Sequence, residues 1–380
     1  MEIETSGGKK KVRIHEMHME EDAGKLIHDE WEDCSLVDYN RSGVPLIEIV
    51  SEPDMRSAEE VIAYLEKLRH LMQYLDVSDC KLQEGSMRAD VNLSVRETGG
   101  SLGTRTEMKN LNSFKAISRA IENERERQIE LLEQGKAVDQ ETRRWDDNKE
   151  YSYAMRSKED AKDYRYFPDP DLPPVHVSDT WLLEIRKAQP ELREEKQQRY
   201  QEEFGLPLYD AQLLTESRCF AALFEETAVL FGNAKKTANW FLVEVLRLMK
   251  EKGMEAEQVK FSPSHLAALL DMVEKKEVSP QNARKIFAEI FDRDAEPRSY
   301  AEKNGLMIVN DTGLLKDTVA RIIDENPEAF AELVGGKDKV LGFFVGLIMK
   351  ELKGRVNPAD VRETLKKQIE RRKTQETQEI

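Results

Sequence analysis

Several segments within the first 110 residues have the pattern of apolar and polar positions that is typical of β-strands. Residues 46–50 are apolar except for Glu48, a pattern that predicts a buried strand with one carboxylate in its middle. Because an ionised carboxylate is rarely buried alone, Glu48 is predicted to be either a salt-bridged core residue or a cation ligand. Residues 87–96 alternate strictly, and residues 104–109 continue the pattern. These segments predict a sheet with one polar, open face.

Two segments with a helical period lie between and after these strands. Ser57 and Glu60 form a capping-box pattern at the start of the first, whose apolar stripe begins at Val61. The second is predicted to start near Ser113 and to end before Gly135. Helices packed on a sheet with one polar face predict an α+β domain.

The second half of the chain has an almost entirely helical pattern. Four prolines in residues 164–174 predict a stiff, extended linker before it, and later prolines lie near expected helix starts. We therefore expect three domains, spanning residues 1–177, 178–296 and 297–374. The first is α+β, and the other two are all-α.

The composition of the chain indicates a cytosolic protein with a localised basic end. The 380 residues include 39% hydrophobic and 35% charged positions, which fits a cytosolic protein. The three cysteines are far apart, which argues against a zinc site and a disulfide framework. Net charge is −16, but residues 337–373 hold eleven Lys/Arg against five Asp/Glu. An acidic chain with a basic end predicts a localised contact with phosphates, as in RNA.

No P-loop, dinucleotide-binding or zinc-protease motif is present, so the candidate chemistry comes from carboxylates on predicted strands. His18, Glu20 and Asp22 share one face if their segment is extended, and Glu48 lies on another strand. Oxygen ligands on rigid strands suit Mg²⁺, which commonly works with phosphates. The alternative is a solvated strand face with surface ion pairs. Cations that could contact phosphates are Lys25, Arg41, Arg88, Arg105 and Lys109.

Gly342 and Gly346 are spaced by four residues within an apolar helical segment. On general grounds they are expected to allow close helix packing inside the core. The alternative is that they let another chain or an RNA backbone approach. The basic helix that follows them is either an ordinary solvated surface or an RNA contact.

Long segments of the chain resemble one family, the B subunits of bacterial aspartyl/glutamyl-tRNA(Asn/Gln) amidotransferases. The resemblance covers nearly the whole chain. The segments are HMEEDAGK (18–25), VDYNRSGVPLIEIVSEPD (37–54), LQEGSMRADVNLSVR (82–96), TEMKNLNSFKAI (106–117), QETRRW (140–145), MRSKEDAKDYRYFPDPDLPP (155–174), SPQNARKIF (279–287) and LGFFVGLIMKELKGRVNPADVRETLKKQI (341–369).

The resemblance implies a fold and an activity. The fold would be a glutamine-synthetase-like cradle with a mixed or antiparallel sheet, then a helical domain and a YqeY-like helical tail. The activity would be that of a carbon–nitrogen ligase with glutamine as amido donor. ATP with Mg²⁺ would phosphorylate the side-chain carboxylate of misacylated Glu-tRNA(Gln) or Asp-tRNA(Asn). Ammonia released from glutamine by the A subunit would then form the amide, in a cytoplasmic heterotrimer with the C subunit.

The resemblance also implies roles for particular residues. Glu20 and Glu48 would be Mg²⁺ ligands. Together with the charge pattern, it predicts a set of catalytic, ATP-binding and tRNA-binding cations. They are Arg41, Arg88 and Lys109 (catalytic), Lys25 and Arg105 (ATP), and Lys366, Lys367, Arg371 and Arg372 (tRNA), with Val361, Leu365 and Ile369 facing inward on the tail helix.

The chain departs from the family at its start. It lacks the Gly-Leu-Glu-Val-His segment whose Glu and His complete the family's metal site, so we expect a truncated cradle with exposed strand edges and little activity alone. A second hypothesis is therefore a module that only binds tRNA or the partner subunits. A third is a stand-alone carboxylate ligase for a small molecule, against which the basic tail argues. The related archaeal E subunits are disfavoured, because they carry an extra domain between the cradle and the helical parts and this sequence shows no such insertion.

Overall fold

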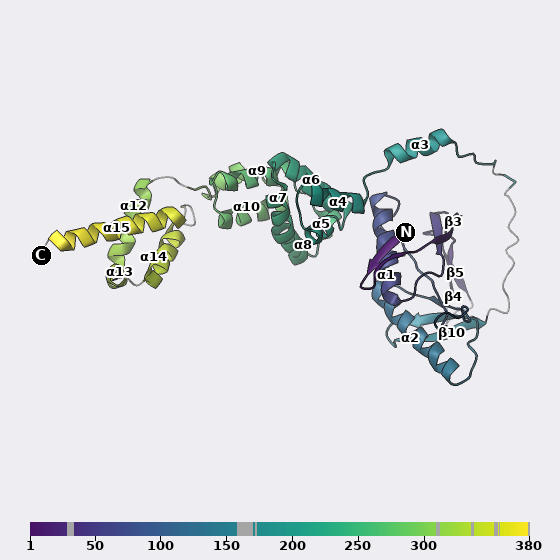
Figure 1. Ribbon diagram of the computed structural model, residues 1–380. Coiled ribbons are helices and arrows are strands. Elements are labelled where there is room, and N and C mark those ends of the chain that lie inside the picture. Colours follow the sequence, from purple (N-terminus) through teal and green to yellow (C-terminus); the bar gives the residue numbers. More distant parts are fainter. Residues whose placement is uncertain are drawn as a thin grey trace. The chain divides into compact units, whose positions relative to one another are not determined.

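The structure is a computed structural model that describes residues 1–28, 34–157, 170–171, 173–308, 312–335, 338–352, 356 and 358–378. It divides into two compact units, Met1–Leu192 and Arg193–Ile380 (Figure 1). None of the helices in the described ranges is both long and apolar enough to cross a bilayer. The predicted linker at 164–174 lies mostly outside these ranges.

The strands of the first unit form one four-stranded sheet and three two-stranded sheets among the described residues. The pairs β1–β2, β3–β6 and β4–β5 are antiparallel. The larger sheet has the order β10-β9-β8-β7, and it is mixed because β8 runs parallel to β9. The strands are β1 (Glu2–Thr5), β2 (Gly8–Lys11), β3 (Ile14–Glu21), β4 (Lys25–His28), β5 (Ser35–Asp38), β6 (Pro45–Ser51), β7 (Val91–Leu93), β8 (Thr106–Lys109), β9 (Glu141–Asp146) and β10 (Tyr151–Ser157).

Two long helices begin where their capping residues predict. Helix α1 (Ala58–Tyr74) follows the N-cap Ser57, and α2 (Phe114–Glu133) follows the N-cap Ser113. In each case the serine hydroxyl accepts a hydrogen bond from a backbone N–H of the first turn. Gly135, with a positive φ of 70°, follows the C-cap residue Gln134 of α2. Both predicted helices are confirmed.

The core of the first unit lies between these helices and the larger sheet. Met108 and Trp145 of the sheet are buried in one cluster with Ile117 and Ile121 of α2. The helix covers one face of the sheet, and alternate residues of the strands are left on the other face. The predicted α+β class is confirmed.

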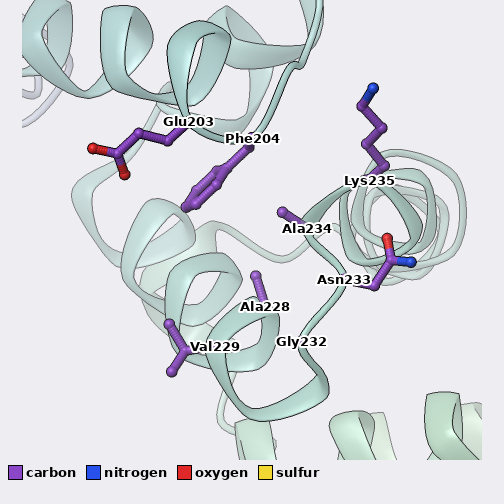
Figure 2. Close-up of a pocket in the computed structure, with 8 residues that line it drawn as sticks. All are labelled: Glu203, Phe204, Ala228, Val229, Gly232, Asn233, Ala234 and Lys235. Carbon is purple, nitrogen blue, oxygen red and sulfur yellow. The ribbon is translucent and has the colours of Figure 1, made fainter.

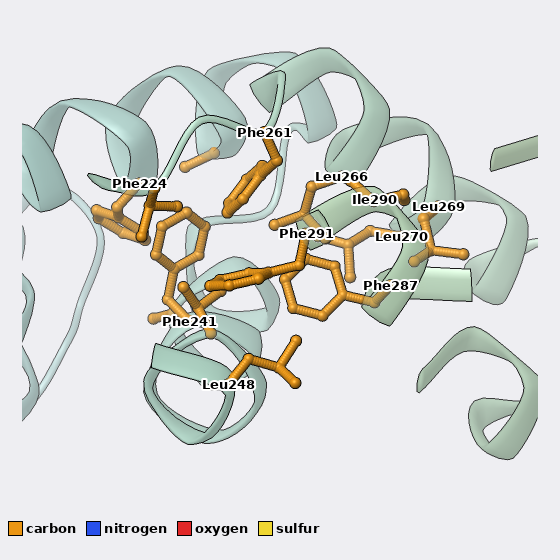
Figure 3. Close-up of a cluster of buried hydrophobic side chains, with 14 of the residues drawn as sticks. Phe224, Phe241, Leu248, Phe261, Leu266, Leu269, Leu270, Phe287, Ile290 and Phe291 are labelled. Atoms are coloured by element: carbon orange, nitrogen blue, oxygen red, sulfur yellow. The ribbon is translucent and has the colours of Figure 1, made fainter. Parts of the chain in front are cut away.

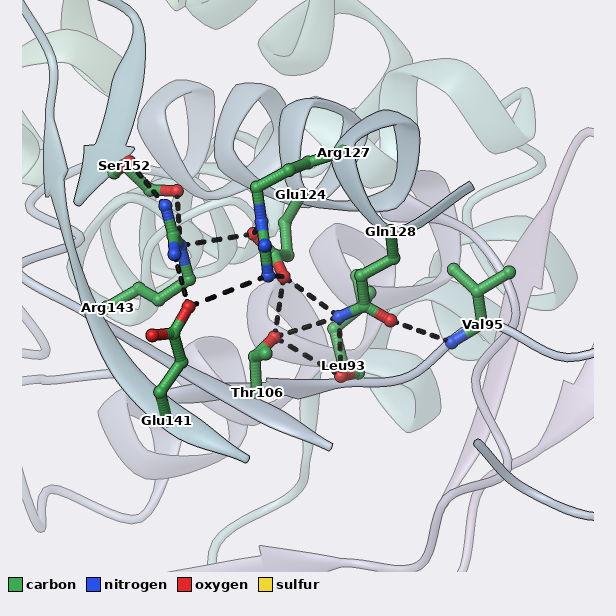
Figure 4. A network of polar contacts seen from close by, with 9 residues as sticks. All are labelled: Leu93, Val95, Thr106, Glu124, Arg127, Gln128, Glu141, Arg143 and Ser152. Atoms are coloured by element: carbon green, nitrogen blue, oxygen red, sulfur yellow. Dashed lines mark hydrogen bonds and ion pairs between the residues drawn. The ribbon is translucent and has the colours of Figure 1, made fainter. Parts of the chain in front are cut away.

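A buried polar network joins α2 to this sheet (Figure 4). The Glu124 carboxylate has no exposed surface and accepts hydrogen bonds from Thr106 Oγ1 on β8 and Gln128 Nε2, both at 2.8 Å. It also pairs with Arg127 Nη2 at 2.7 Å and Arg143 Nε on β9 at 3.4 Å. This network was not predicted from the sequence, although Glu124 and Gln128 are spaced by one helical turn on the buried side of α2.

Two strand predictions need correction. The segment around Glu48 is not buried, because β6 pairs with β3 alone among the described residues, and 52% of the Glu48 side chain is exposed. The core-residue hypothesis for Glu48 is therefore wrong. The strand predicted over residues 87–96 forms only at Val91–Leu93, since a partner strand meets it only there.

The second unit is helical and has two separate hydrophobic cores. The first includes Phe224, Phe241, Phe261 and Phe287, whose rings meet mostly edge to face (Figure 3). Its helices are α4 (Arg193–Glu202), α5 (Leu208–Leu214), α6 (Arg218–Phe231), α7 (Ala234–Trp240), the π-helical turn η1 (Phe241–Val245), α8 (Leu246–Lys252), the 3₁₀ turn η2 (Ala256–Gln258), α9 (Pro263–Glu274), α10 (Pro280–Arg293) and α11 (Pro297–Lys303).

The second core of this unit is formed by its last four helices. Phe344 and Leu365 are fully buried in it. Its helices are α12 (Thr312–Glu325), α13 (Pro327–Val334), α14 (Asp338–Glu351) and α15 (Pro358–Gln378). Ala301 of α11 packs in the first core rather than in this one, although residues 297–374 were expected to form one domain. One further helix, α3 (Asp179–Ala188), belongs to the first unit and has no buried residue.

The glycine pair of α14 does not serve close packing. A Cβ atom built on Gly342 or Gly346 meets no heavy atom of the described structure within 4 Å, and both positions are exposed. The expectation that they allow helix packing inside the core is wrong. The neighbouring Phe343 is also 49% exposed.

Candidate functional site

The strands β3 and β6 place three potential metal ligands at one point. Their register sets His18 opposite Glu48, and Glu20 lies two residues along β3 on the same face. His18 Nε2 lies 2.8 Å from Glu20 Oε1 and 2.9 Å from Glu48 Oε2. All three ligand atoms lie within 4.8 Å of one another, and the side chains are about half exposed.

The charges of this cluster suit a cation. The hydrogen bond to Glu48 raises the pKa of His18 above its usual value near 6.5, and the bond to Glu20 adds to the effect. The Nε2 atom of His18 thus lies between two carboxylates, where a metal ion could lie. Carboxylate oxygens are the ligands that Mg²⁺ and Mn²⁺ prefer, whereas an imidazole is more usual as a ligand of Zn²⁺ or Fe²⁺. Metal binding would require His18 to lose its proton.

Arg41 and Arg88 converge on the carboxylate of Asp22, directly after the end of β3. Arg41 Nη2 lies 2.7 Å from Asp22 Oδ2, and Arg88 Nη2 lies 3.0 Å from Asp22 Oδ1. Burial raises the pKa of Asp22, but the hydrogen bond from Arg88 and the charges of both guanidinium groups outweigh it and lower the pKa. Asp22, which the strand pattern placed on one face with His18 and Glu20, holds two of the predicted catalytic cations together.

A hydrogen bond to the backbone of Gly85 also holds the Arg41 side chain in place. Arg41 Nη1 donates a hydrogen bond of 2.7 Å to the carbonyl oxygen of Gly85. Gly85 has a φ of 75°, and a Cβ atom at this position would lie 2.5 Å from Arg41 Nη1. Glycine is therefore favoured here by the backbone conformation, and a Cβ atom would displace the guanidinium of Arg41.

Lys109 is the third predicted catalytic cation and lies at the end of β8. Its Nζ is 3.0 Å from Asp90 Oδ2 and 3.2 Å from Glu107 Oε1. Burial lowers the pKa of Lys109, but the hydrogen bond from its ammonium to Asp90 and the carboxylate charges outweigh this and raise it. Lys109 is thus a charged, well-anchored ammonium.

The two predicted ATP-binding cations do not join these groups. Lys25 begins β4, and Arg105 directly precedes β8. Both side chains are exposed, and neither makes a polar contact with another residue in the described part of the chain. Their role in ATP binding stays a prediction.

Comparison with known proteins decides the family. The GatB/GatE catalytic domain matches residues 1–183, and the GatB domain matches residues 222–369. The B subunit of the aspartyl/glutamyl-tRNA(Asn/Gln) amidotransferase of Agathobacter rectalis is 62% identical over 96% of this chain and 77% of its own length. The B subunit from Lachnospira eligens is 58% identical, over 94% and 75% of the two chains, and that from Caldicellulosiruptor bescii 50%, over 98% and 78%.

The chain belongs to the family of these amidotransferase B subunits. The resemblance drawn from its sequence segments is confirmed.

In this member of the B-subunit family, the predicted tRNA-binding cations lie on α15. Val361 and Leu365 are buried and Ile369 is half-buried, so the predicted inward face is confirmed. Lys366, Lys367 and Arg371 are exposed, and Lys367 Nζ pairs with Glu363 Oε1 at 2.6 Å. The side chain of Arg372 lies outside the described residues. Contact of these cations with tRNA stays a prediction.

A surface hollow of about 430 Å³ lies among helices α4, α6 and α7 of the second unit (Figure 2). Its ionisable lining residues are Glu203 and Lys235, and the other side chains that line it are mainly apolar. It contains none of the predicted site residues of this B-subunit family member. The candidate site is therefore the cluster on β3 and β6 with its neighbouring cations.

Proposed function

We propose that this chain is the B subunit of a tRNA-dependent amidotransferase, with ATP-dependent activation of a carboxylate as its chemistry. The γ-phosphoryl group of ATP would be transferred to a side-chain carboxylate oxygen of misacylated Glu-tRNA(Gln) or Asp-tRNA(Asn), with release of ADP. Ammonia derived from glutamine would then displace phosphate and form the amide. The names of the relatives, which describe them as B subunits of aspartyl/glutamyl-tRNA(Asn/Gln) amidotransferases, support this proposal.

The residues of the site have separate tasks in this proposal. Glu20, Glu48 and a deprotonated His18 would hold Mg²⁺, which neutralises phosphate charge when bound. Arg41 and Arg88 would offset the charge that accumulates between carboxylate and triphosphate.

The remaining cations serve binding in the same proposal. Lys109 would orient the reacting groups from its fixed place on β8, while Lys25 and Arg105 would contact ATP. Partners would be the A subunit as ammonia source and the C subunit. The first unit would be the glutamine-synthetase-like cradle.

The observation that supports the proposal most directly is the meeting of Glu20, Glu48 and His18 at one exposed point. Mutual repulsion of two carboxylates is costly unless a proton or a cation lies between them. The register of the two paired strands brings these three side chains within reach of one divalent ion.

The experiment compares three chains, each assembled with the A and C subunits. Wild type, Glu48→Gln and the control Glu21→Gln are assayed for Gln-tRNA(Gln) formation from Glu-tRNA(Gln), ATP, Mg²⁺ and glutamine. Glu21 is exposed on the same strand as Glu20 and makes no polar contact with the described residues. We expect Glu48→Gln to lower the rate by at least about ten- to a hundredfold, with Glu21→Gln unchanged.

Each outcome has a distinct meaning. Glutamine hydrolysis by the A subunit should persist in the Glu48→Gln assembly, since the ammonia source is intact. Wild-type amidation by Glu48→Gln with unaltered Mg²⁺ dependence would remove Glu48 from the metal site. A wild-type assembly that binds tRNA but forms no amide would favour a module that only binds.

A further inference from the structure

The open face of the four-stranded sheet presents a row of three residues from three strands. The register sets Lys109 of β8 beside Arg144 of β9, and Arg144 opposite Tyr153 of β10. Directly paired residues point to the same face, with Cβ atoms about 5 Å apart. The adjacent Arg143 and Trp145 are buried on the side of α2, so this row lies on the other side.

The three members of the row differ in how their charge is compensated. Lys109 is neutralised by Asp90 and Glu107. Arg144 is exposed and makes no hydrogen bond or ion pair with any described residue. Tyr153 is 42% exposed. The uncompensated guanidinium of Arg144 thus lies beside the accessible ring of Tyr153, and Tyr151, two residues away on β10, is a second exposed ring.

A chain of contacts joins the row to the candidate site. Lys109 binds Asp90, and Arg88, two residues before Asp90, binds Asp22. Asp22 in turn lies two residues beyond Glu20 on the same polypeptide segment. A ligand that reacts near the metal cluster could therefore extend along these polar groups to the sheet.

We propose that Arg144 and Tyr153 bind one unpaired nucleotide of the tRNA, next to its aminoacylated 3′ end. The base stacks on the Tyr153 ring, and Arg144 contacts the adjoining phosphodiester. Open four-stranded sheets backed by helices bind unpaired bases in this way, by aromatic stacking. The proposal rests on the proposed function, because it names the part of the tRNA that the same site receives.

Charge favours an RNA chain over free ATP at this position. One phosphodiester has one negative charge, which matches the guanidinium of Arg144. A triphosphate has several negative charges and would face the carboxylates of Glu107 and Asp90, which already flank Lys109 in the row. The metal cluster is the better place for the triphosphate.

The test uses two RNA probes and the whole 380-residue chain. One probe is tRNA(Gln) with its unpaired 3′ nucleotides, and the other is the same tRNA with those nucleotides removed. Tyr153→Ala should weaken binding of the intact tRNA by roughly 5- to 100-fold and leave binding of the trimmed tRNA unchanged. Tyr153→Phe, which keeps the ring, should bind intact tRNA like wild type. Tyr209→Ala is the matched control, because Tyr209 is 68% exposed on α5.

A second variant addresses the phosphate and keeps the test informative if Tyr153→Ala fails to fold. Arg144→Gln changes an exposed side chain that has no polar partner among the described residues, so the fold should tolerate it. It should weaken binding of the intact tRNA alone and lower the slope of log K against log salt by about one unit.

Three results would overturn the proposal. They are equal losses for intact and trimmed tRNA, no loss for either variant, and a loss of ATP binding by Tyr153→Ala with tRNA binding unchanged. Amidation by the wild-type assembly is scored separately. Its absence would count against the proposed function, whereas the difference between the two RNA probes tests Arg144 and Tyr153 alone.

Discussion

Replacing Glu124 by leucine should destabilise the first unit more than any exposed substitution on the same helix. The carboxylate has no exposed surface and bonds to groups on α2, β8 and β9. Its network also reaches β7 through Gln128, which donates to the Leu93 carbonyl oxygen at 3.2 Å, and β10 through Arg143, which donates to Ser152 Oγ at 2.9 Å. One side chain therefore links the helix to the whole sheet.

The expected magnitude follows from what the leucine would leave behind. Arg143 is 6% exposed and would lose one of its two carboxylate partners, keeping Glu141. Gln128 and Thr106 would each lose an acceptor in the interior. Breaking a buried ion pair from one side costs about 3–5 kcal/mol. Glu124→Gln keeps an acceptor oxygen, so it should cost less, about 1–3 kcal/mol.

Hydrogen exchange read by mass spectrometry measures this effect strand by strand. Where amide exchange requires unfolding of the unit, Glu124→Leu should speed exchange in β8 and β9 by about two to four orders of magnitude. The control is Glu122→Leu on the same helix, whose partner Arg125 is exposed and whose loss should cost under about 1 kcal/mol. Equal exchange in the two variants would refute the argument that the network stabilises the sheet.

The remaining predictions concern pH, a glycine and the tail. Burial raises the pKa of Glu124, but its hydrogen bonds outweigh this and lower the pKa below its usual 4.5. Its contribution is therefore full above pH 4.5 and is lost as the pH falls further, so acid unfolding of Glu124→Gln should depend less on pH below 4.5 than that of wild type. Gly85→Ala should cost about 1–2 kcal/mol because of its positive φ, and it should slow amidation by displacing Arg41; an unchanged rate would show that Arg41 needs no such anchor. Lys366→Gln with Arg371→Gln should lower the salt slope of tRNA binding by about two units and raise KM more than it changes kcat; an unchanged slope would make α15 an ordinary solvated surface.

Local patterns predicted the helices well, because their signals lie within the helix itself. Ser57 and Ser113 cap α1 and α2 as expected, and the inward face of α15 follows its apolar spacing. The burial predicted from the apolar run around Glu48 was wrong, because burial is not decided within the strand itself. Burial of a strand depends on the layers packed against it, and the sequence of β6 says nothing about which layers those are.

Part of the candidate site could likewise be predicted from local sequence patterns, and the rest depends on contacts between distant segments. Alternation along β3 placed His18 and Glu20 on one face, but the register with β6 was needed to bring Glu48 to them. No local pattern could show that Arg41 and Arg88, 47 residues apart in sequence, share the carboxylate of Asp22. Such a pairing depends on tertiary contacts.

The two halves of the candidate site differ in their structural support. On the sheet, the row with Lys109 has the Glu124 network and a packed core behind it. On β3 and β6 no residue is buried, and the face opposite His18 exposes Met19 at 79% and Ile47 at 43%. The predicted metal ligands are therefore held by the strand pairing and the ion pairs of Asp22, with nothing in the described residues packed behind them. Since a metal site needs fixed ligands to bind tightly, the affinity of this cluster for its ion should depend on what covers that apolar face.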